Sequence, residues 1–172
     1  MNKLPKLILS DIDGVWTDGS MYYTEAGDAM KRFHTYDSAG VLFCKLLEIP
    51  VGIVTGENHQ SVAQRAKKLG LDYVLLEIKN KVIAIEKIMD ELKIQWKDVA
   101  YIGDDINDLK VLKKVGFSAS VPTAPDYIKS QVDYITKLNG GEGAFRDFVE
   151  YILKQNDKMD FVLDMLEINF RK

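Results

Sequence analysis

The sequence predicts an α/β fold, in which a doubly wound, Rossmann-like, mostly parallel sheet carries a projecting β-hairpin and no cap domain. Short apolar runs of strand length alternate with amphipathic stretches of helical length. This alternation is typical of a parallel sheet with helices on its faces. The chain has 172 residues, 47% of them hydrophobic, which suits one domain with a buried core.

Apolar runs and helical periodicity give the order of the elements. The expected strands are 6–12, 51–54, 73–76, 99–102 and 117–121, with an edge strand at 133–136. The expected helices are 38–47, 81–92, 106–115 and 144–153. A further helix is expected after 51–54; Asn58 caps it and Gly70 ends it. Strands 20–24 and 29–34 form the expected hairpin, with a turn around Gly27. Residues 1–154 are thus the predicted core, and 155–172 are either an extra helix that docks on a partner subunit or a frayed tail.

Composition excludes several classes of protein. Cys44 is the only cysteine, so an internal disulfide and a cysteine metal cluster are ruled out. No apolar run reaches the ~20 residues that cross a bilayer, and residues 1–6 lack the apolar segment of a secretory signal. The net charge is −3 without a long basic run, which argues against nucleic acid. We therefore expect a cytoplasmic protein that binds neither membranes nor nucleic acid.

Two acids directly follow the first predicted strand, in the sequence Asp11-Ile12-Asp13-Gly14. Ligands of open parallel sheets bind beyond the carboxyl ends of the strands, and residues two apart leave a strand on the same side. One carboxylate can attack phosphorus while a second protonates the leaving oxygen. Acids after a strand also cap turns and helices, but that explanation is weaker for two acids beside a glycine.

A second acidic cluster follows strand 99–102 and consists of Asp104, Asp105 and Asp108. Carboxylate oxygens are the ligands that Mg²⁺ prefers. Acids in the first turn of a helix also complement its dipole. Considered alone, this cluster therefore fits a metal site and helix capping equally well.

Two further features lie at the same predicted edge of the sheet. Thr55 and Gly56 close strand 51–54, where a hydroxyl and free backbone N–H groups could hold phosphate oxygens. Lys81 is the first residue of a predicted helix. A cation is unfavourable there, next to the positive end of the helix dipole, unless an anion lies nearby. Taken alone, Thr55-Gly56 is most often only a turn, and a lysine such as Lys81 is most often a solvated surface residue.

The combination of these features resembles the haloacid dehalogenase (HAD) superfamily of phosphotransferases. The resemblance covers about residues 7–153. Within that superfamily, the motif Asp-Gly-Val-Trp-Thr-Asp-Gly at 13–19 and the motif Gly-Gly-Glu-Gly-Ala-Phe-Arg at 140–146 are similar to the sugar-acid phosphatases. That subgroup includes the 3-deoxy-manno-octulosonate (KDO) 8-phosphate and the nonulosonate (KDN) 9-phosphate phosphatases.

The resemblance implies a role for each matching residue. Asp11 is the expected nucleophile and Asp13 the expected general acid and base. The groups expected to bind the phosphoryl group are Thr55, Gly56 and Lys81. The expected Mg²⁺ ligands are Asp11, the backbone carbonyl of Asp13, and Asp104. Asp105 and Asp108 are expected to support the site, Asp108 through Lys81 or through metal-bound water.

The spacing of the motifs leaves no room for a cap domain. Only a hairpin and one helix separate Asp11 from Thr55, and one helix and one strand separate Thr55 from Lys81. In the subgroup that the chain resembles, a neighbouring protomer of a tetramer covers the open site. We therefore expect a homotetramer assembled through the hairpin, because an isolated hairpin is only marginally stable.

Three residues are expected to select the sugar-acid phosphate. Glu57 follows Thr55-Gly56; the KDO 8-phosphate group typically has Arg at this place and the KDN 9-phosphate group has Glu. Arg65 and Lys68 are three residues apart on one helical face and could bind the substrate carboxylate, in the same subunit or across a boundary. The sequence thus favours KDN 9-phosphate, with KDO 8-phosphate as the alternative.

Two other classes of function were weighed against the phosphatase. A phosphoacceptor module of receiver type places its acceptor Asp at a third strand end, but Glu77 is the acid that follows strand 73–76. A catalytically silent, phosphatase-like assembly domain is disfavoured because the expected catalytic residues are all present. Turnover of an aryl phosphate with Mg²⁺ separates the three.

Overall fold

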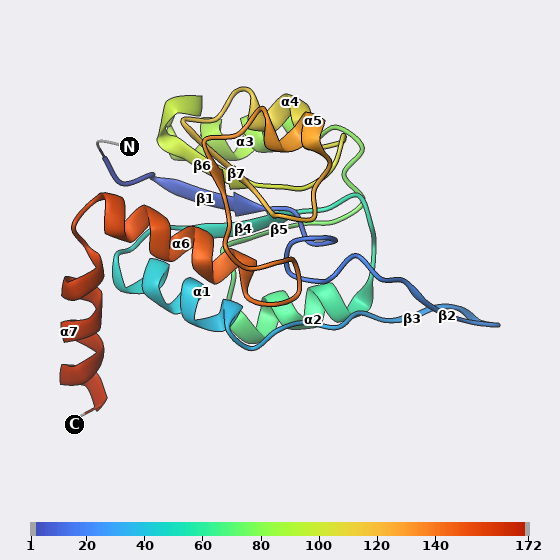
Figure 1. The fold of residues 1–172 in the computed structure, drawn as a ribbon, viewed down its shortest axis with the longest axis horizontal. Helices are drawn as coiled ribbons and strands as arrows, with labels where there is room; N and C mark the ends of the chain where they lie inside the picture. Colours follow the sequence, from blue (N-terminus) through green and yellow to red (C-terminus); the bar gives the residue numbers. More distant parts are fainter. Residues whose placement is uncertain (1–2, 171–172) are drawn as a thin grey trace.

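A six-stranded parallel sheet forms the centre of the computed structural model, which describes residues 3–170 (Figure 1). The order of its strands is β5-β4-β1-β6-β7-β8. These strands are β1 Leu7–Ser10, β4 Val51–Val54, β5 Tyr73–Leu75, β6 Val99–Ile102, β7 Phe117–Ser120 and β8 Tyr134–Ile135. The chain runs from β1 to β4 and β5 on one side, and then to β6, β7 and β8 on the other. The order therefore reverses around β1, and such a switch point is where ligands bind in open α/β sheets.

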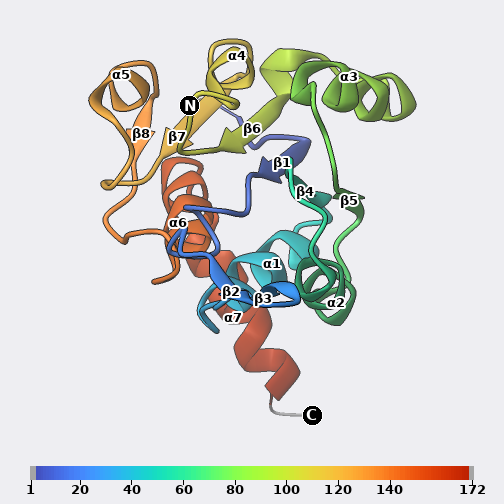
Figure 2. The same ribbon diagram turned by 90° about the vertical axis from the view of Figure 1, so that its right-hand side faces the viewer.

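Helices cover both faces of the sheet, which confirms the predicted doubly wound architecture (Figures 1 and 2). One face carries α1 Asp37–Leu46, α2 Gln60–Leu69 and α6 Ala144–Gln155. The other face carries α3 Lys81–Leu92, α4 Leu109–Leu112 and α5 Asp126–Lys129, and the 3-10 turn η1 Trp96–Asp98 precedes β6. Strands β1, β4, β6 and β7 are buried along their whole length, as a sheet covered on both faces requires. Within residues 3–170, none of the helices combines the length and the apolar character that a membrane span needs.

The predicted hairpin projects from the body of the protein beside the carboxyl ends of the strands (Figure 1). It consists of β2 Tyr22–Thr24 and β3 Gly27–Met30, which pair antiparallel. It is shorter than expected, because its turn lies at residues 25–26 and strand pairing ends at Met30. Large apolar side chains on and beside it are exposed: Met21, Tyr22, Tyr23 and Met30.

Two helix boundaries differ from the sequence prediction. Helix α2 is capped by His59 and not by Asn58, because the His59 side chain accepts a hydrogen bond from Ser61 N; Gly70 ends it in the left-handed conformation, as predicted. The helix expected over 106–115 is reduced to α4. Residues 103–108 form a loop instead, because backbone N–H groups at its start bond the Asp108 side chain.

The segment after α6 is helical, since α7 spans Met159–Phe170 (Figure 1). Val162 is fully buried, and α7 contacts both α1 and α6. Helix α6 continues to Gln155, one residue past the predicted core boundary. The division of the chain at residue 154 and the docking of the tail on a partner subunit stay predictions.

Candidate active site

The residues predicted to bind phosphate and the predicted catalytic acids lie together at the carboxyl edge of the sheet. Asp11 follows β1 and Thr55 follows β4, which is the neighbour of β1. A cavity of about 160 Å³ opens there. Its lining residues are Asp11, Asp13, Met21, Thr55, Gly56, Glu57 and Asn107. Met21 comes from the base of the hairpin, and neither it nor Asn107 was predicted to line the site.

Asp11 is almost fully buried, and both of its oxygens are held. Oδ1 accepts a hydrogen bond from Ile12 N at 2.8 Å, and Oδ2 lies 2.9 Å from Lys81 Nζ. Burial, and then the charge of Asp108, raise the pKa of Asp11 well above its usual value, while Lys81 opposes the shift. An ionised Asp11 at neutral pH therefore depends on nearby positive charge, which Lys81 supplies in part and a metal ion would complete.

Lys81 opens α3 at a position where its ammonium group reaches two carboxylates. Nζ lies 2.7 Å from Asp108 Oδ1 in addition to its contact with Asp11. Burial disfavours the charged ammonium, but the charges of Asp11 and Asp108 outweigh it and raise the pKa of Lys81. The lysine is 3% exposed, so it belongs to the site and is not the solvated surface residue that a lone lysine usually is.

Asp108 uses both oxygens to organise the acidic loop. Oδ1 also accepts a hydrogen bond from the Tyr101 hydroxyl, so the buried Tyr101 belongs to this polar network. Oδ2 accepts from Asp104 N at 3.1 Å and Asp105 N at 3.3 Å. A Cβ at Gly103 would lie 2.4 Å from Asp108 Cγ, so glycine permits this close approach.

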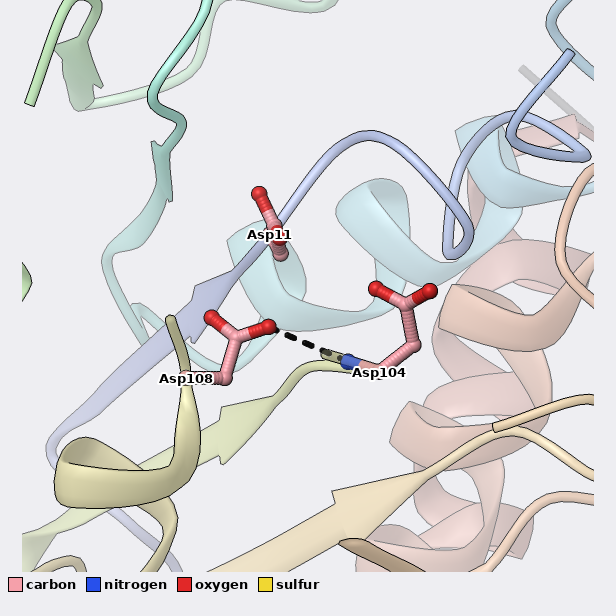
Figure 3. Close-up of side chains that lie close together, drawn as sticks. All are labelled: Asp11, Asp104 and Asp108. Atoms are coloured by element: carbon pink, nitrogen blue, oxygen red, sulfur yellow. Dashed lines mark hydrogen bonds between the residues drawn. The ribbon is translucent and has the colours of Figure 1, made fainter. Parts of the chain in front are cut away.

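The carboxylates of Asp11, Asp104 and Asp108 come together from two segments of the chain, the end of β1 and the loop after β6 (Figure 3). One oxygen from each lies within 4.8 Å of the others. Asp104 Oδ1 is buried and has no hydrogen-bond partner among residues 3–170. Burial, and then the charges of Asp108 and Asp105, raise the pKa of Asp104 to about 7.

These features fit a divalent cation. A buried carboxylate oxygen without a donor is costly, and a metal ion would remove that cost. Asp108 already accepts from four donors, whereas Asp104 has the oxygen left for a metal and Asp11 lies beside it; that Asp11 and Asp104 bind Mg²⁺ stays a prediction. A Cβ at Gly14 would lie 1.8 Å from Asp104 Oδ2, so this carboxylate packs directly against the Asp13-Gly14 backbone.

Asp13 is held by two donors, neither of which was predicted from the sequence. Its Oδ1 accepts from Thr17 Oγ1 at 3.2 Å and from Lys31 Nζ at 2.7 Å. The Lys31 side chain is fully buried, and a single lysine after a hairpin strand gives no sequence signal for such a contact. Trp16 is buried in the same loop, stacks on Phe145 and donates to Ser10 Oγ.

The three expected specificity residues do not all meet in the cavity. Glu57 lines it beside Thr55, whose hydroxyl accepts from Glu57 N at 3.2 Å. Arg65 turns toward the start of α1, where its Nη2 donates to Ser38 Oγ at 2.9 Å and to the His34 carbonyl at 3.2 Å. Lys68 is exposed on α2. Arg65 and Lys68 are therefore absent from the lining of this chain's own cavity.

The fold and the site define a Mg²⁺-dependent phosphoric monoester hydrolase of the haloacid dehalogenase class. The model of the haloacid dehalogenase-like hydrolases matches residues 77–146. The KDO 8-phosphate phosphatase KdsC of Escherichia coli K12 is 34% identical over 155 residues, which are 90% of this chain and 82% of that protein. The chain belongs to the family of these KdsC phosphatases.

Solved structures agree with this assignment. The KDO 8-phosphate phosphatase of Moraxella catarrhalis, in complex with magnesium, phosphate and KDO, has a TM-score of 0.89 and 34% identity, covering 94% of this chain and 93% of that chain. A probable YrbI family phosphatase of Pseudomonas syringae has a TM-score of 0.91 and 34% identity, covering 95% and 93%.

Proposed function

We propose that this protein removes the terminal phosphate of a 2-keto-3-deoxy sugar acid, with KDO 8-phosphate as the favoured substrate. One observation carries the chemistry: a buried carboxylate, Asp11, is paired with Lys81 and lies beside a half-buried carboxylate, Asp104, whose buried Oδ1 has no donor among residues 3–170. The substrate is inferred from the relatives, which are named as KDO 8-phosphate phosphatases.

In the first step the Asp11 carboxylate attacks phosphorus. A new P–O bond forms to its oxygen, and the bond from phosphorus to the sugar oxygen breaks with its electron pair on that oxygen. Asp13 gives its proton to this oxygen, so the sugar acid leaves as an alcohol. Lys81, Thr55 and the Gly56 backbone bind the phosphoryl oxygens, whose charge spreads in the transition state.

In the second step water attacks the phosphorus of the aspartyl phosphate. The water gives a proton to Asp13, which is now a carboxylate and acts as the base. The P–O bond to Asp11 breaks, its electron pair returns to the carboxylate, and inorganic phosphate leaves. Both acids thus end in the state in which they began.

Mg²⁺ is the cofactor that the oxygen-only donor set fits. Asp11, Asp104 and the backbone carbonyl of Asp13 would hold it. When bound, it neutralises the negative charge shared by the nucleophile and the phosphate. The carboxylates themselves are brought together by the chain, because Asp108 fixes the loop that carries Asp104.

A homotetramer would cover the cavity, which has no cap domain over it. Exposed Tyr23 and Met30 on the hairpin, with 68% and 55% exposure, are apolar surface that assembly would bury. A neighbour would then also be the source of Arg65 and Lys68 for each site. Sedimentation should show a tetramer at assay concentration; a fully active monomer would contradict this part of the proposal.

KDN 9-phosphate is the second candidate, and Glu57 is the observation that favours it. Glu57 lines the cavity, and a carboxylate accepts hydrogen bonds from substrate hydroxyls, whereas Arg favours an anion. The relatives support the eight-carbon substrate instead, so the nine-carbon preference expected from the sequence is not the main proposal.

The two candidates are separated by kcat/KM on both substrates, measured for the wild type, for Glu57→Arg and for Glu86→Arg. Glu86 is a charge-reversal control on α3 outside the cavity lining. A wild-type preference for KDO 8-phosphate supports the main proposal. A preference for KDN 9-phosphate that only Glu57→Arg reverses would replace it with the second candidate.

A further inference from the structure

We propose that Lys31 is a positioning residue for the general acid Asp13, and that the hairpin acts on catalysis through it. The inference rests on the proposed phosphatase chemistry and adds a residue that the mechanism does not otherwise use. Lys31 immediately follows β3, while Asp13 lies in the loop after β1. Their 2.7 Å ion pair therefore joins the hairpin to the catalytic loop.

The geometry divides the two oxygens of Asp13 between two tasks. Oδ1 accepts from both Thr17 Oγ1 and Lys31 Nζ. Oδ2 has no hydrogen bond to any of residues 3–170, and the Asp13 side chain is 25% exposed and lines the cavity. Oδ1 is thus committed to holding the carboxyl group, and Oδ2 is the oxygen available to the reacting atoms.

Burial makes this contact costly to break. The Lys31 side chain has no exposed surface, and a buried ammonium group without its partner carries a large desolvation penalty. Its other recorded contact is with the Met21 sulfur at 3.9 Å, which is a weak acceptor. Lys31 therefore fixes the carboxyl orientation more firmly than the neutral hydroxyl of Thr17 can alone.

The orientation matters because the proton must travel through one particular oxygen. In the first step Oδ2–H donates to the sugar oxygen as the P–O bond breaks, and in the second step Oδ2 takes a proton from the attacking water. If the carboxyl group rotates, its proton misses the leaving oxygen. Such a loss slows substrates with poor leaving groups and spares those whose leaving group needs no proton.

The next residue along the chain provides a matched control. Arg32 Nη2 lies 3.0 Å from Asp18 Oδ2, so it also joins the hairpin to the catalytic loop. This pair is more exposed, with 57% and 29% side-chain exposure, and does not touch Asp13. Lys31→Met and Arg32→Met each remove one cation from the same segment and keep an apolar stem.

The test is kcat/KM with Mg²⁺ on phenyl phosphate, a poor leaving group, and on 2,4-dinitrophenyl phosphate, a good one. We expect Lys31→Met to lose about 30- to 100-fold on phenyl phosphate, up to the lower end of the roughly 10²- to 10⁴-fold contribution of general acid catalysis, and less than about threefold on the dinitrophenyl ester. Arg32→Met should change both by less than about threefold. Equal losses on both esters, or none on phenyl phosphate, would overturn the proposal.

A double-mutant cycle shows whether Lys31 acts through Asp13. In an Asp13→Asn background, Lys31→Met should cost less than about twofold more, because the group it positions is already gone; an undiminished further loss would overturn the inference. If Lys31→Met does not fold, Thr17→Val removes the other donor to Oδ1 and should give the same leaving-group selectivity in weaker form. A wild type without activity on either ester would instead remove the proposed function itself.

Discussion

Lys81 Nζ lies 2.7 Å from Asp108 Oδ1, and this buried ion pair ties the start of α3 to the loop after β6. The same ammonium group reaches Asp11 at 2.9 Å. Asp108 therefore helps to determine where Lys81 lies with respect to Asp11, the proposed nucleophile. It also holds the backbone of Asp104 and Asp105 through its second oxygen. The carboxylate is thus expected to serve both stability and turnover.

Asp108→Asn should lower both the stability and kcat. Asparagine keeps one acceptor oxygen, so its NH₂ group must face either the two backbone N–H groups or Lys81 and Tyr101, and buried donors left without acceptors cost about 1–3 kcal/mol each. The weaker hold on Lys81 should reduce kcat by about 10- to 100-fold, a loss of roughly 1.4–2.8 kcal/mol in transition-state stabilisation. Urea unfolding and steady-state kinetics measure the two effects. The control Asp105→Asn, at an exposed side chain, should change kcat by less than about threefold; equal effects of the two variants would contradict this role.

Asp104→Asn should weaken Mg²⁺ binding while the fold survives. The wild type should lose activity in excess EDTA and regain it with Mg²⁺, whereas the variant should need at least about tenfold more Mg²⁺ for half-maximal activity. Thermal unfolding gives a readout independent of turnover, because a bound ligand stabilises the folded state by about 2.7 kcal/mol at 100 times its Kd. Ca²⁺ should support turnover poorly, since its looser coordination positions the reacting groups less well. An unchanged Mg²⁺ dependence in Asp104→Asn would count against this ligand.

The burial of Asp37 predicts that the free energy of unfolding depends on pH, independently of catalysis. The residue is fully buried at the start of α1, its Oδ1 accepts from Arg146 N, and its Oδ2 has no hydrogen-bond partner in the described part of the chain, residues 3–170. Burial raises the pKa of Asp37 from 3.8 to about 7. Between these two values the folded protein keeps a proton that the unfolded chain releases. The free energy of unfolding should therefore fall as the pH rises from about 4 to 7, by at most about 1.4 kcal/mol per pH unit.

The Asp37→Asn variant tests this directly. The unfolding free energies of the variant and the wild type are measured in urea from pH 4 to 8. That of the variant should rise relative to that of the wild type up to about pH 7, and the difference between them should then stay constant. Asp126→Asn, at a carboxylate whose side chain is 99% exposed, should leave the pH dependence unchanged. A constant difference between Asp37→Asn and the wild type at every pH would show that Asp37 does not titrate between the two states.

The sheet and its motifs were predictable because their signals are local. Buried strands such as 51–54 and 99–102 are continuous apolar runs, and Asp11 and Thr55 directly follow such runs, so the parallel topology brings them together. Contacts between distant segments carry no such signal. The pairing of Lys31 with Asp13, the hydroxyl contact of Tyr101 with Asp108 and the turn of Arg65 toward α1 depend on tertiary packing.

The turn expected around Gly27 predicted that the hairpin exists, but its shorter strands were not predictable in the same way. Its side chains are largely exposed, so no burial pattern fixes where pairing ends. The helix expected over 106–115 shows the opposite case. The sequence has helical periodicity there, but the Asp108 side chain accepts hydrogen bonds from Asp104 N and Asp105 N. These bonds keep residues 103–108 in a loop.

The central claim is that Asp11 is the nucleophile of a phosphatase, and Asp11→Asn tests it most directly. Asparagine keeps the size of the side chain but cannot form an acyl phosphate, and loss of a nucleophile can cost on the order of 10⁶ in kcat. The measurement is phosphate release from KDO 8-phosphate with Mg²⁺ by the wild type and by pure, folded Asp11→Asn. We expect kcat to fall at least about 10³-fold. A variant that releases phosphate at nearly the wild-type rate would contradict the account.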